Sequence, residues 1–335
     1  MKQPSSIQRK ALNLIRVIKP KGIGNIQLED IPTPKLDSHQ VLVRTAKTLI
    51  SRGSELFRRY IKEEAISPSI MGYSLIGAIE QVGSEVTKYH VGQRGMVVAP
   101  HAQYAIGDVN ALVKSSIRPL TEGVSFEEGT FLLLAKEATA WVDSSGVKAG
   151  AQVVVLGQGV VGSLMMQLLC DRQVKQIIIV DTFPLRCQLS QQLGADEVIN
   201  ASEVNPVEVV KQLTNGRGAD LVIDCVGGYT SIKSFEQAQD IVADRGTIQL
   251  IALYQQRALP LHATKIMHKR LLAGILTDES PMETSLRAMN SIEKRIIQVK
   301  EMIAHQFPYT EAKEAFDFLW HTPEKGLGVL LDWDI

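Results

Sequence analysis

The stretch that decides the fold runs from Val153 to Gly162 and reads VVVLGQGVVG. Its first four residues form a continuous apolar run, which is typical of a strand buried on both faces of a parallel sheet. Apolar positions from Val161 to Leu169 then recur with the spacing of one helix face. The glycines between the two match G-x-G-x-x-G, a pattern of the turn between such a strand and helix. The stretch therefore predicts a βα unit whose turn can approach an anion closely.

Each glycine of this turn has its own expected role. Gly157 permits the tight turn, Gly159 lets the backbone approach a pyrophosphate, and Gly162 allows close packing of helix on strand. Asp181 ends the next apolar run, 19 residues after Gly162, where a carboxylate can bind the adenosine ribose hydroxyl groups. Because it would also repel a 2′-phosphate, the pattern predicts NAD(H) rather than NADP(H). We expect Arg186, five residues further on, to flank the adenine; the alternative is an ordinary βαβ unit without a ligand.

Strands and helices alternate beyond this unit. Apolar runs predict strands at 177–180, 197–199, 221–223, 247–251 and 271–276, and helical patterns lie around 185–193 and 207–213. This alternation predicts an α/β fold with a doubly wound parallel sheet and right-handed crossovers. Earlier in the chain, short runs at 11–15, 41–43, 76–82 and 96–98 predict a small β unit, followed by a helix over 127–141. Residues 282–335 hold amphipathic helices and end in a strand-like run at 328–331.

The composition narrows the class of protein. The 335 residues have zero formal net charge and are 45% hydrophobic, so no basic excess is available for nucleic-acid phosphates. No apolar run approaches the ~20 residues that a membrane-spanning helix needs. Cys170, Cys187 and Cys225 lie far apart and provide no disulfide framework, which fits a reducing cytoplasm. We expect a cytoplasmic protein with a small-molecule substrate, and no binding to nucleic acid or membrane.

Several separated motifs make the chain similar to the medium-chain dehydrogenases/reductases, the superfamily of alcohol dehydrogenases and quinone reductases. Besides the glycine turn, they are the stretches at 32–44, at 71–95 (MGYSLIG…VGSEV…VGQRG) and at 219–228 (ADLVIDCVGG). The resemblance implies a Rossmann nucleotide-binding domain and a GroES-like, mostly-β catalytic domain that is split in sequence. We expect residues 1–131 and 281–335 to form the catalytic domain and 132–280 the NAD-binding domain, with the active site in the cleft between them.

The resemblance also implies further cofactor contacts and an assembly. Additional candidates for contact with NAD(H) are Thr139, Val161, Thr182, Cys225, Val226 and Ala252. Relatives pair the last strands of two Rossmann sheets across a two-fold axis, which here would be residues 271–276. Since an exposed apolar edge strand is prone to aggregate unless it is paired or covered, we expect a homodimer. The alternative is a monomer whose edge is shielded by residues 277–281.

The chain departs from the family at the zinc ligands. Zinc-dependent members hold Zn²⁺ with a Cys, a His and a second Cys or Glu, the donors that zinc prefers. The matching positions here fall within residues 51–55 (SRGSE), at Tyr73 and near Ala135, and none supplies a Cys or His. The four cysteines of the structural zinc lobe are absent as well. Glu55, Glu137 and His101 could form only a weak zinc site, so we expect no metal.

Without zinc, a hydroxyl or ammonium group must stabilise charge on the substrate oxygen. Tyr73 occupies the vacated His position, and Lys136, beside another lost ligand, could lower the Tyr73 pKa by favouring the phenolate. His101 could relay a proton near neutral pH, Glu55 keeps a carboxylate, and Ser51 could donate a hydroxyl. In the alternative interpretation Tyr73 only fills space, Lys136 pairs with a neighbouring carboxylate such as Glu137, and His101 and Ser51 are structural.

Three functions remain open. The first is a zinc-independent, NAD(H)-dependent oxidoreductase that interconverts an alcohol and a ketone or aldehyde. The second is reduction of an activated C=C bond, as in quinone and enoyl reductases; those relatives usually prefer NADPH, so Asp181 speaks against it. The third is a non-catalytic NAD(H)-binding protein; the intact glycine turn argues against it, because a fold that has lost its chemistry tends to lose its cofactor motif as well. We expect the first. The basic stretch at 58–62 indicates a solvated helix face more than a site for an acidic substrate.

Overall fold

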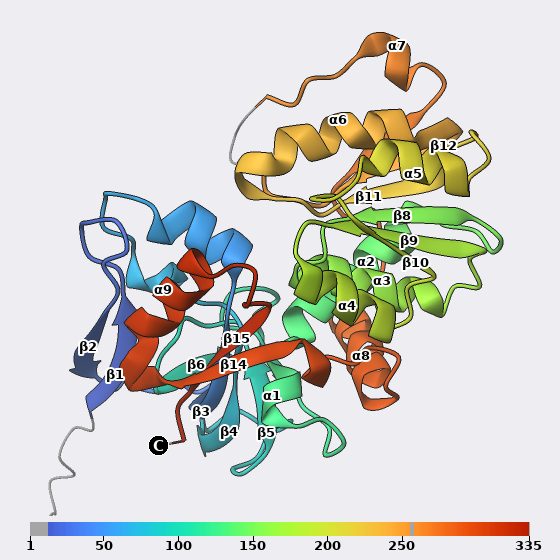
Figure 1. Cartoon of the computed structure of the whole chain (residues 1–335). Coiled ribbons are helices and arrows are strands. Elements are labelled where there is room, and N and C mark those ends of the chain that lie inside the picture. The colour runs from blue at the N-terminus through green and yellow to red at the C-terminus, as the bar shows by residue number, and fades with distance from the viewer. Residues whose placement is uncertain (1–12, 255–257, 335) are drawn as a thin grey trace, which may run out of the picture.

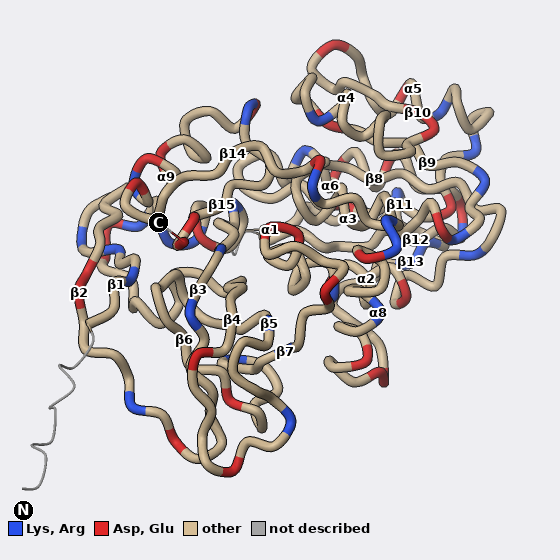
Figure 2. Tube along the Cα trace, turned by 90° about the horizontal axis from the view of Figure 1, so that it is seen from below, with Lys and Arg blue, Asp and Glu red and all other residues tan. Residues whose placement is uncertain are grey.

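The computed structural model describes residues 13–254 and 258–334. These residues form two lobes, each built on its own sheet. The lobe whose strands lie between residues 152 and 273 is at the upper right of Figure 1. Acidic and basic residues are interspersed along both lobes (Figure 2). Among the described residues, no helix combines the length and the hydropathy that crossing a bilayer requires.

The first lobe contains a six-stranded sheet in the order β10-β9-β8-β11-β12-β13, in which all neighbours are parallel. The strands are β8 (Gln152–Leu156), β9 (Gln176–Asp181), β10 (Glu197–Asn200), β11 (Ala219–Asp224), β12 (Val242–Leu250) and β13 (Arg270–Ala273). The chain starts in the middle at β8, runs out to β10, crosses back to β11 and continues to the other edge. This is the Rossmann order, and the predicted doubly wound sheet is confirmed.

Helices cover both faces of this sheet because successive residues of its central strands point to opposite sides. They are α2 (Leu132–Ser145), α3 (Val160–Cys170), α4 (Pro184–Gln192), α5 (Pro206–Leu213), α6 (Ser231–Ile241) and α8 (Pro281–Glu293), whereas α7 (Ala263–Ile266) lies against α6, away from the sheet. Val153 and Val155 pack with α2, α3 and α8, whereas Val154 packs with α5 and α6. Figure 1 shows α5 and α6 on the side of the sheet opposite to α2 and α3.

The second lobe contains a mixed sheet in the order β14-β15-β3-β4-β5-β7, with β6 paired to β3. Its strands are β3 (Gln40–Ile50), β4 (Leu75–Val82), β5 (Arg94–Val97), β6 (Tyr104–Asp108), β7 (Ile117–Pro119), β14 (Ile303–Pro308) and β15 (Gly328–Asp332). Strand β15 pairs antiparallel with β3, so both ends of the chain build one sheet. A hairpin of β1 (Asn13–Ile18) and β2 (Gln27–Pro32) lies beside it.

Short helices complete this lobe. They are η1 (Arg52–Tyr60), a π-helix, the 3₁₀ turns η2 (Pro68–Ile70), η4 (Lys300–Met302) and η5 (Tyr309–Glu311), and the α-helices α1 (Phe126–Gly129) and α9 (Ala312–His321). The 3₁₀ turn η3 (Gly228–Thr230) belongs to the Rossmann lobe. The sequence predicted a mostly-β unit here and, of η1, only a helix face at 58–62.

Element boundaries differ from the sequence expectation at several elements, including β3 and β12, which are longer than expected, and three further differences have a local cause or limit. The single helix expected over 127–141 is two helices, α1 and α2, separated at Thr130 and Phe131. The strand expected at 271–276 ends at Ala273, since Gly274 takes a left-handed φ of 82°. The strand expected at 11–15 is observed from Asn13 onward, and residues 11–12 lie outside the described residues.

Candidate cofactor and active site

The glycine turn has the geometry that its sequence predicted. Gly157 takes a φ of 86°, a conformation that L side chains rarely adopt. A Cβ on Gly162 would collide with the carbonyl oxygen of Gly157, so only glycine lets α3 start this close to β8. A Cβ on Gly159, the N-cap of α3, would meet no atom within 4 Å. The N-terminus of α3 therefore faces open space, where its free N–H groups can meet an anion.

Asp181 lies directly beside this turn at the end of β9. Its Oδ2 accepts a hydrogen bond from the Gln158 amide at 2.7 Å, and its Oδ1 accepts from Thr182 at 2.7 Å and Phe183 at 2.9 Å. A carboxylate has about four acceptor positions, so three bonds leave capacity for a hydroxyl. The carboxylate is fixed where a ribose acceptor of a Rossmann domain is expected.

The other cofactor candidates gather at the same edge. β8 and β11 are neighbours at the point where the strand order reverses, and ligands of such sheets bind outside the carboxyl ends there. Cys225 follows β11 and donates its amide to Leu156 at 2.9 Å. A Cβ on Gly157 would lie 2.8 Å from a Val226 methyl group. Ala252 lies in the segment after β12, and its amide donates to the Asp224 carbonyl at 3.1 Å.

For three further candidates, the structure gives their position in the fold. Val161 is in the first turn of α3, and Thr182 is exposed at the end of β9. Thr139 is buried in α2, and its hydroxyl donates to the Ala135 carbonyl at 2.8 Å. Their contacts with a cofactor stay predictions.

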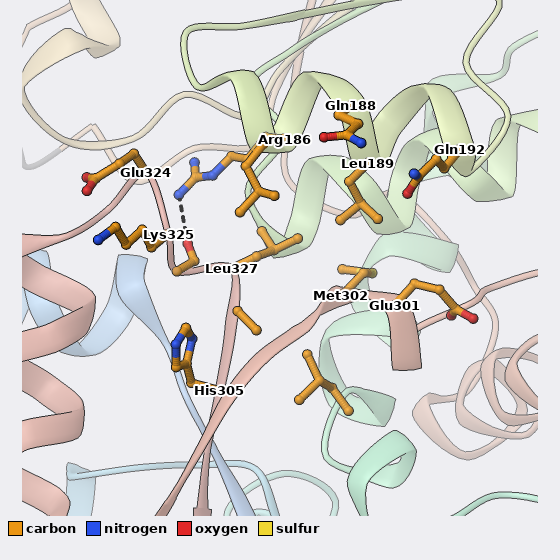
Figure 3. Close-up of a pocket in the computed structure, with 14 residues that line it drawn as sticks. Arg186, Gln188, Leu189, Gln192, Glu301, Met302, His305, Glu324, Lys325 and Leu327 are labelled. Carbon is orange, nitrogen blue, oxygen red and sulfur yellow. Dashed lines mark hydrogen bonds between the residues drawn. The ribbon is translucent and has the colours of Figure 1, made fainter.

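Arg186 makes a contact that the sequence did not suggest. Its guanidinium donates to the carbonyls of Pro323 at 2.9 Å and Gly326 at 3.1 Å, and lies 4.7 Å from the centre of the Phe183 ring. In Figure 3 it lies at one end of a cavity of about 480 Å³ between α4, β14 and the segment before β15. Arg186 thus joins the two lobes, and its contact with adenine stays a prediction.

Tyr73 lies in a cluster with two hydroxyl groups from the start of η1. Burial raises the Tyr73 pKa to about 12, although hydrogen bonds with Ser51 and Ser54 oppose the rise. The Ser51 hydroxyl also caps η1 by accepting from the Ser54 amide at 3.3 Å. The expected lowering of this pKa by Lys136 is wrong, because Lys136 Nζ is 2.6 Å from Glu137 Oε1. The cation that favours the Tyr73 phenolate is Arg59.

Glu55 and His101 form a fully buried pair behind this cluster. His101 Nε2 donates to Glu55 Oε1 at 2.9 Å, and the other carboxylate oxygen accepts from the Ser51 amide at 2.9 Å. The His101 amide donates to Met71 at 2.7 Å, two residues before Tyr73. His101 Nδ1 has no hydrogen-bond partner among the described residues. The sequence picked out both residues separately, and the structure brings them together as the support of the Ser51–Tyr73 region.

Helix η1, which begins beside this cluster, also contacts the Rossmann lobe. The Phe57 ring packs edge-on against Tyr229 with centroids 6.2 Å apart, and a Cβ on Gly228 would lie 2.8 Å from Phe57. A Cβ on Gly53 would lie 3.9 Å from Leu253. Both contacts involve segments that follow β11 and β12. The start of η1 therefore faces the edge where the cofactor candidates gather. The sequence did not predict this contact, because residues 52–60 contain no motif that indicates one.

The donor set does not fit a catalytic zinc. Glu55 and His101 bind each other, and Glu137 binds Lys136. Within the ranges 13–254 and 258–334, no group of three or more His, Cys, Asp or Glu side chains is placed to hold a metal ion. Zinc sites in enzymes use at least three protein ligands.

Comparisons with known proteins agree with this architecture. The family model described as "Zinc-binding dehydrogenase" matches residues 160–291. L-threonine 3-dehydrogenase of Bacillus licheniformis is 24% identical, with 92% of this chain and 96% of that protein covered. Human sorbitol dehydrogenase is 24% identical, with 92% of each chain covered. The crystal structure of 2R,3R-butanediol dehydrogenase from Bacillus subtilis has a TM-score of 0.80 at 17% identity, covering 95% of this chain and 99% of that one.

A dehydrogenase structure from Sinorhizobium meliloti, described as putative zinc-binding and bound to NADP, also has a TM-score of 0.80, at 19% identity, over 95% of this chain and 99% of that one. The similarity thus extends over both lobes, and the motifs quoted from the sequence lie in both. The chain is therefore similar, over nearly its whole length, to medium-chain zinc-binding dehydrogenases, and it is an enzyme of the dehydrogenase type.

Proposed function

We propose that the protein is a zinc-independent, NAD(H)-dependent oxidoreductase that interconverts an alcohol and a ketone or aldehyde. The observation that carries this proposal is the Tyr73 hydroxyl, which is bonded to Ser51 and Ser54 where a metal-dependent relative would place zinc ligands. A bound nicotinamide cofactor would accept or supply the hydride. Relatives named threonine, sorbitol and butanediol dehydrogenases support a hydroxylated carbon as the site of reaction.

The cofactor site supports NAD(H) as the partner. The Asp181 carboxylate lies beside the glycine turn and keeps free acceptor capacity for a ribose hydroxyl. A 2′-phosphate at that place would bring a second negative charge to a buried carboxylate, which is unfavourable. A structure with this fold holds NADP, so the fold itself does not exclude a 2′-phosphate, and we assign the choice in this chain to Asp181.

The Tyr73 phenol is suited to proton donation at neutral pH. With a pKa of about 12, it is protonated and can donate its proton to the oxygen of a carbonyl substrate as that oxygen gains negative charge. In the opposite direction the phenolate must accept the proton of the alcohol. We therefore infer that alcohol oxidation accelerates as the pH rises toward the pKa of Tyr73, whereas carbonyl reduction does not require high pH.

The residues around Tyr73 orient it. Ser51 and Ser54 hold the hydroxyl, and Glu55 holds the backbone of Ser51 while it binds His101. Since the donor set does not fit zinc, no step of the reaction is assigned to a metal. We also infer a domain division at residue 131 and a return to the second lobe after α8, later than the expected boundary at 281, because α8 packs with α2 and α3 on the Rossmann lobe. We further infer a small-molecule substrate and a cytoplasmic location, the last from the three dispersed cysteines.

The test is a spectrophotometric screen of NADH oxidation and NAD⁺ reduction against panels of alcohols, carbonyl compounds and enones. We expect turnover with an alcohol and its carbonyl partner. The Tyr73→Phe variant should lose about 10²–10⁴-fold in kcat, the usual contribution of general acid–base assistance, with unchanged NADH affinity. Tyr89→Phe is the matched control, because its hydroxyl donates to the Ile117 carbonyl at 3.2 Å in the second lobe, apart from the candidate site.

Two outcomes would contradict the proposal. Retention of more than about half of the activity by Tyr73→Phe would make Tyr73 a space-filling residue, and His101 the next candidate. Turnover of enones alone would indicate a C=C reductase.

A further inference from the structure

A second buried carboxylate lies at the same sheet edge and takes no part in the chemistry proposed above. Asp224 is the last residue of β11 and is fully buried. Its Oδ1 accepts from the Ser234 hydroxyl at 2.6 Å and from the Val226 amide at 3.2 Å. Its Oδ2 accepts from the Tyr254 hydroxyl at 3.0 Å. All three donors are neutral groups.

These bonds join three separate segments. Val226 belongs to the turn after β11, Ser234 to α6, and Tyr254 to the segment after β12. The backbone carbonyl of Asp224 also accepts from the amides of Ile251 and Ala252, each at 3.1 Å. One residue therefore connects the turn at 225–228 to the segment at 251–254. These are the two backbone segments that contain the candidates Cys225, Val226 and Ala252.

Placing a carboxylate here is costly for the fold. Burial of a charge is unfavourable unless strong hydrogen bonds or an opposite charge compensate it. Hydrogen bonds to a charged acceptor are shorter and roughly twice as strong as neutral ones. The carboxylate therefore holds the Tyr254 hydroxyl, and with it the segment at 251–254, more rigidly than a neutral acceptor of the same shape would.

We propose that Asp224 is a positioning residue for the nicotinamide half of the cofactor and that the Tyr254 hydroxyl transmits this role to the segment at 251–254. Together they fix the separation of the two segments between which that half of the cofactor lies. The adenosine half is bound elsewhere, at Asp181 and the glycine turn, and does not depend on this link. The proposal rests on the proposed function, because it assumes a nicotinamide cofactor at this edge.

The experiment compares two probes that share the adenosine half. NADH carries the nicotinamide ring, and ADP-ribose lacks it. Their dissociation constants are measured by calorimetry for the wild type, Tyr254→Phe and Asp224→Asn. We expect Tyr254→Phe to weaken NADH about tenfold, the effect of losing one hydrogen bond to a charged group, and to leave ADP-ribose unchanged. Asp224→Asn should act in the same direction, and Tyr254→Phe carries the test if Asp224→Asn does not fold.

Tyr60→Phe is the matched control, because the Tyr60 hydroxyl also donates to a carboxylate, Asp317, at 2.6 Å in the other lobe. It should leave the ratio of the two dissociation constants at the wild-type value. Equal weakening of both probes by Tyr254→Phe, or no weakening of NADH, would overturn the proposal. If the wild type binds ADP-ribose but not NADH, or binds neither, the proposed function fails as well, and the two failures are thereby distinguished.

Discussion

Asp181 is the residue to which we assign the choice between NAD(H) and NADP(H). Its carboxylate is held by three backbone amides, so it cannot turn away from a 2′-phosphate. We expect Asp181→Ser to remove the repulsion and shift the ratio of NADH to NADPH affinity toward NADPH by about tenfold or more, since a charge–charge contact of this kind is worth more than about 1 kcal/mol. The measurement is the dissociation constant of each cofactor by fluorescence titration. Tighter binding of NADPH than NADH by the native protein would contradict this assignment.

The burial of Asp224 should make the free energy of unfolding depend on pH. Burial raises the pKa of its carboxyl from the ordinary value of 3.8 to about 6, and the bonds from Ser234, Val226 and Tyr254 oppose that rise. The folded protein therefore binds this proton more tightly than the unfolded chain does. The resulting stabilisation is fully present below about pH 4 and is lost as the pH rises through about 6, a change of about 3 kcal/mol.

The comparison that isolates this effect is urea unfolding of the wild type and Asp224→Asn at pH 4, 5, 6 and 7. The free energy of unfolding of the wild type should fall relative to that of the variant across this range, because Asn cannot ionise. Contributions from other carboxyl groups, such as the hydrogen-bonded Glu128 whose pKa is lowered, cancel in the difference. Parallel pH profiles for the two proteins would show that Asp224 does not titrate in this window.

At the scale of elements, the sequence predicted best where burial is two-sided. The apolar runs of β8, β9 and β11 have no polar face, and each appears as a strand at its predicted position. Helix α6 was missed because its buried positions, Phe235, Ala238 and Ile241, are separated by polar residues that weaken the helical pattern. Strand β14 was missed for a similar reason, since it alternates only weakly and is mostly half-buried or exposed.

The candidate site could be predicted from the sequence only where elements that are consecutive in the chain form it. The glycine turn and Asp181 are local, because a strand, a turn and a helix that are consecutive in sequence fix their geometry. The Tyr73 cluster is not local, because its partners come from η1, a nine-residue π-helix that is separate from Tyr73 in sequence. That Arg59 rather than Lys136 favours the Tyr73 phenolate follows from the position of this helix and could not be predicted from spacing.

At the scale of the whole molecule, Arg186 joins the two lobes, and Arg52 makes a contact inside the second lobe. Arg186 from α4 binds the carbonyls of Pro323 and Gly326, and Arg52 from η1 binds the carbonyl of Leu319 at 3.3 Å. The Arg186 contact reaches the segment that connects α9 to β15, whereas the Arg52 contact is made to α9 itself. Since β15 pairs with β3, the end of the chain both completes one sheet and anchors the other lobe to it.

The open edge of the Rossmann sheet leads to the prediction about assembly. Strand β13 ends the strand order, and Leu271, Ile275 and Leu276 on and after it are 48%, 38% and 67% exposed. An apolar edge of this kind favours pairing with another strand, and a two-fold axis would pair it with its own copy in a closed assembly. We propose a homodimer and expect light scattering at micromolar concentration to give twice the mass of the chain.

A substitution at this edge should abolish that assembly without unfolding the protein. Leu276→Lys places a charge at the proposed two-fold contact, where it meets the same charge on the partner, so we expect a monomer by the same measurement. Leu112→Lys is the matched control, because Leu112 is 73% exposed in the loop before β7 and belongs to the other lobe. A wild-type monomer at micromolar concentration, or a dimer that survives Leu276→Lys and dissociates with Leu112→Lys, would move the interface away from β13.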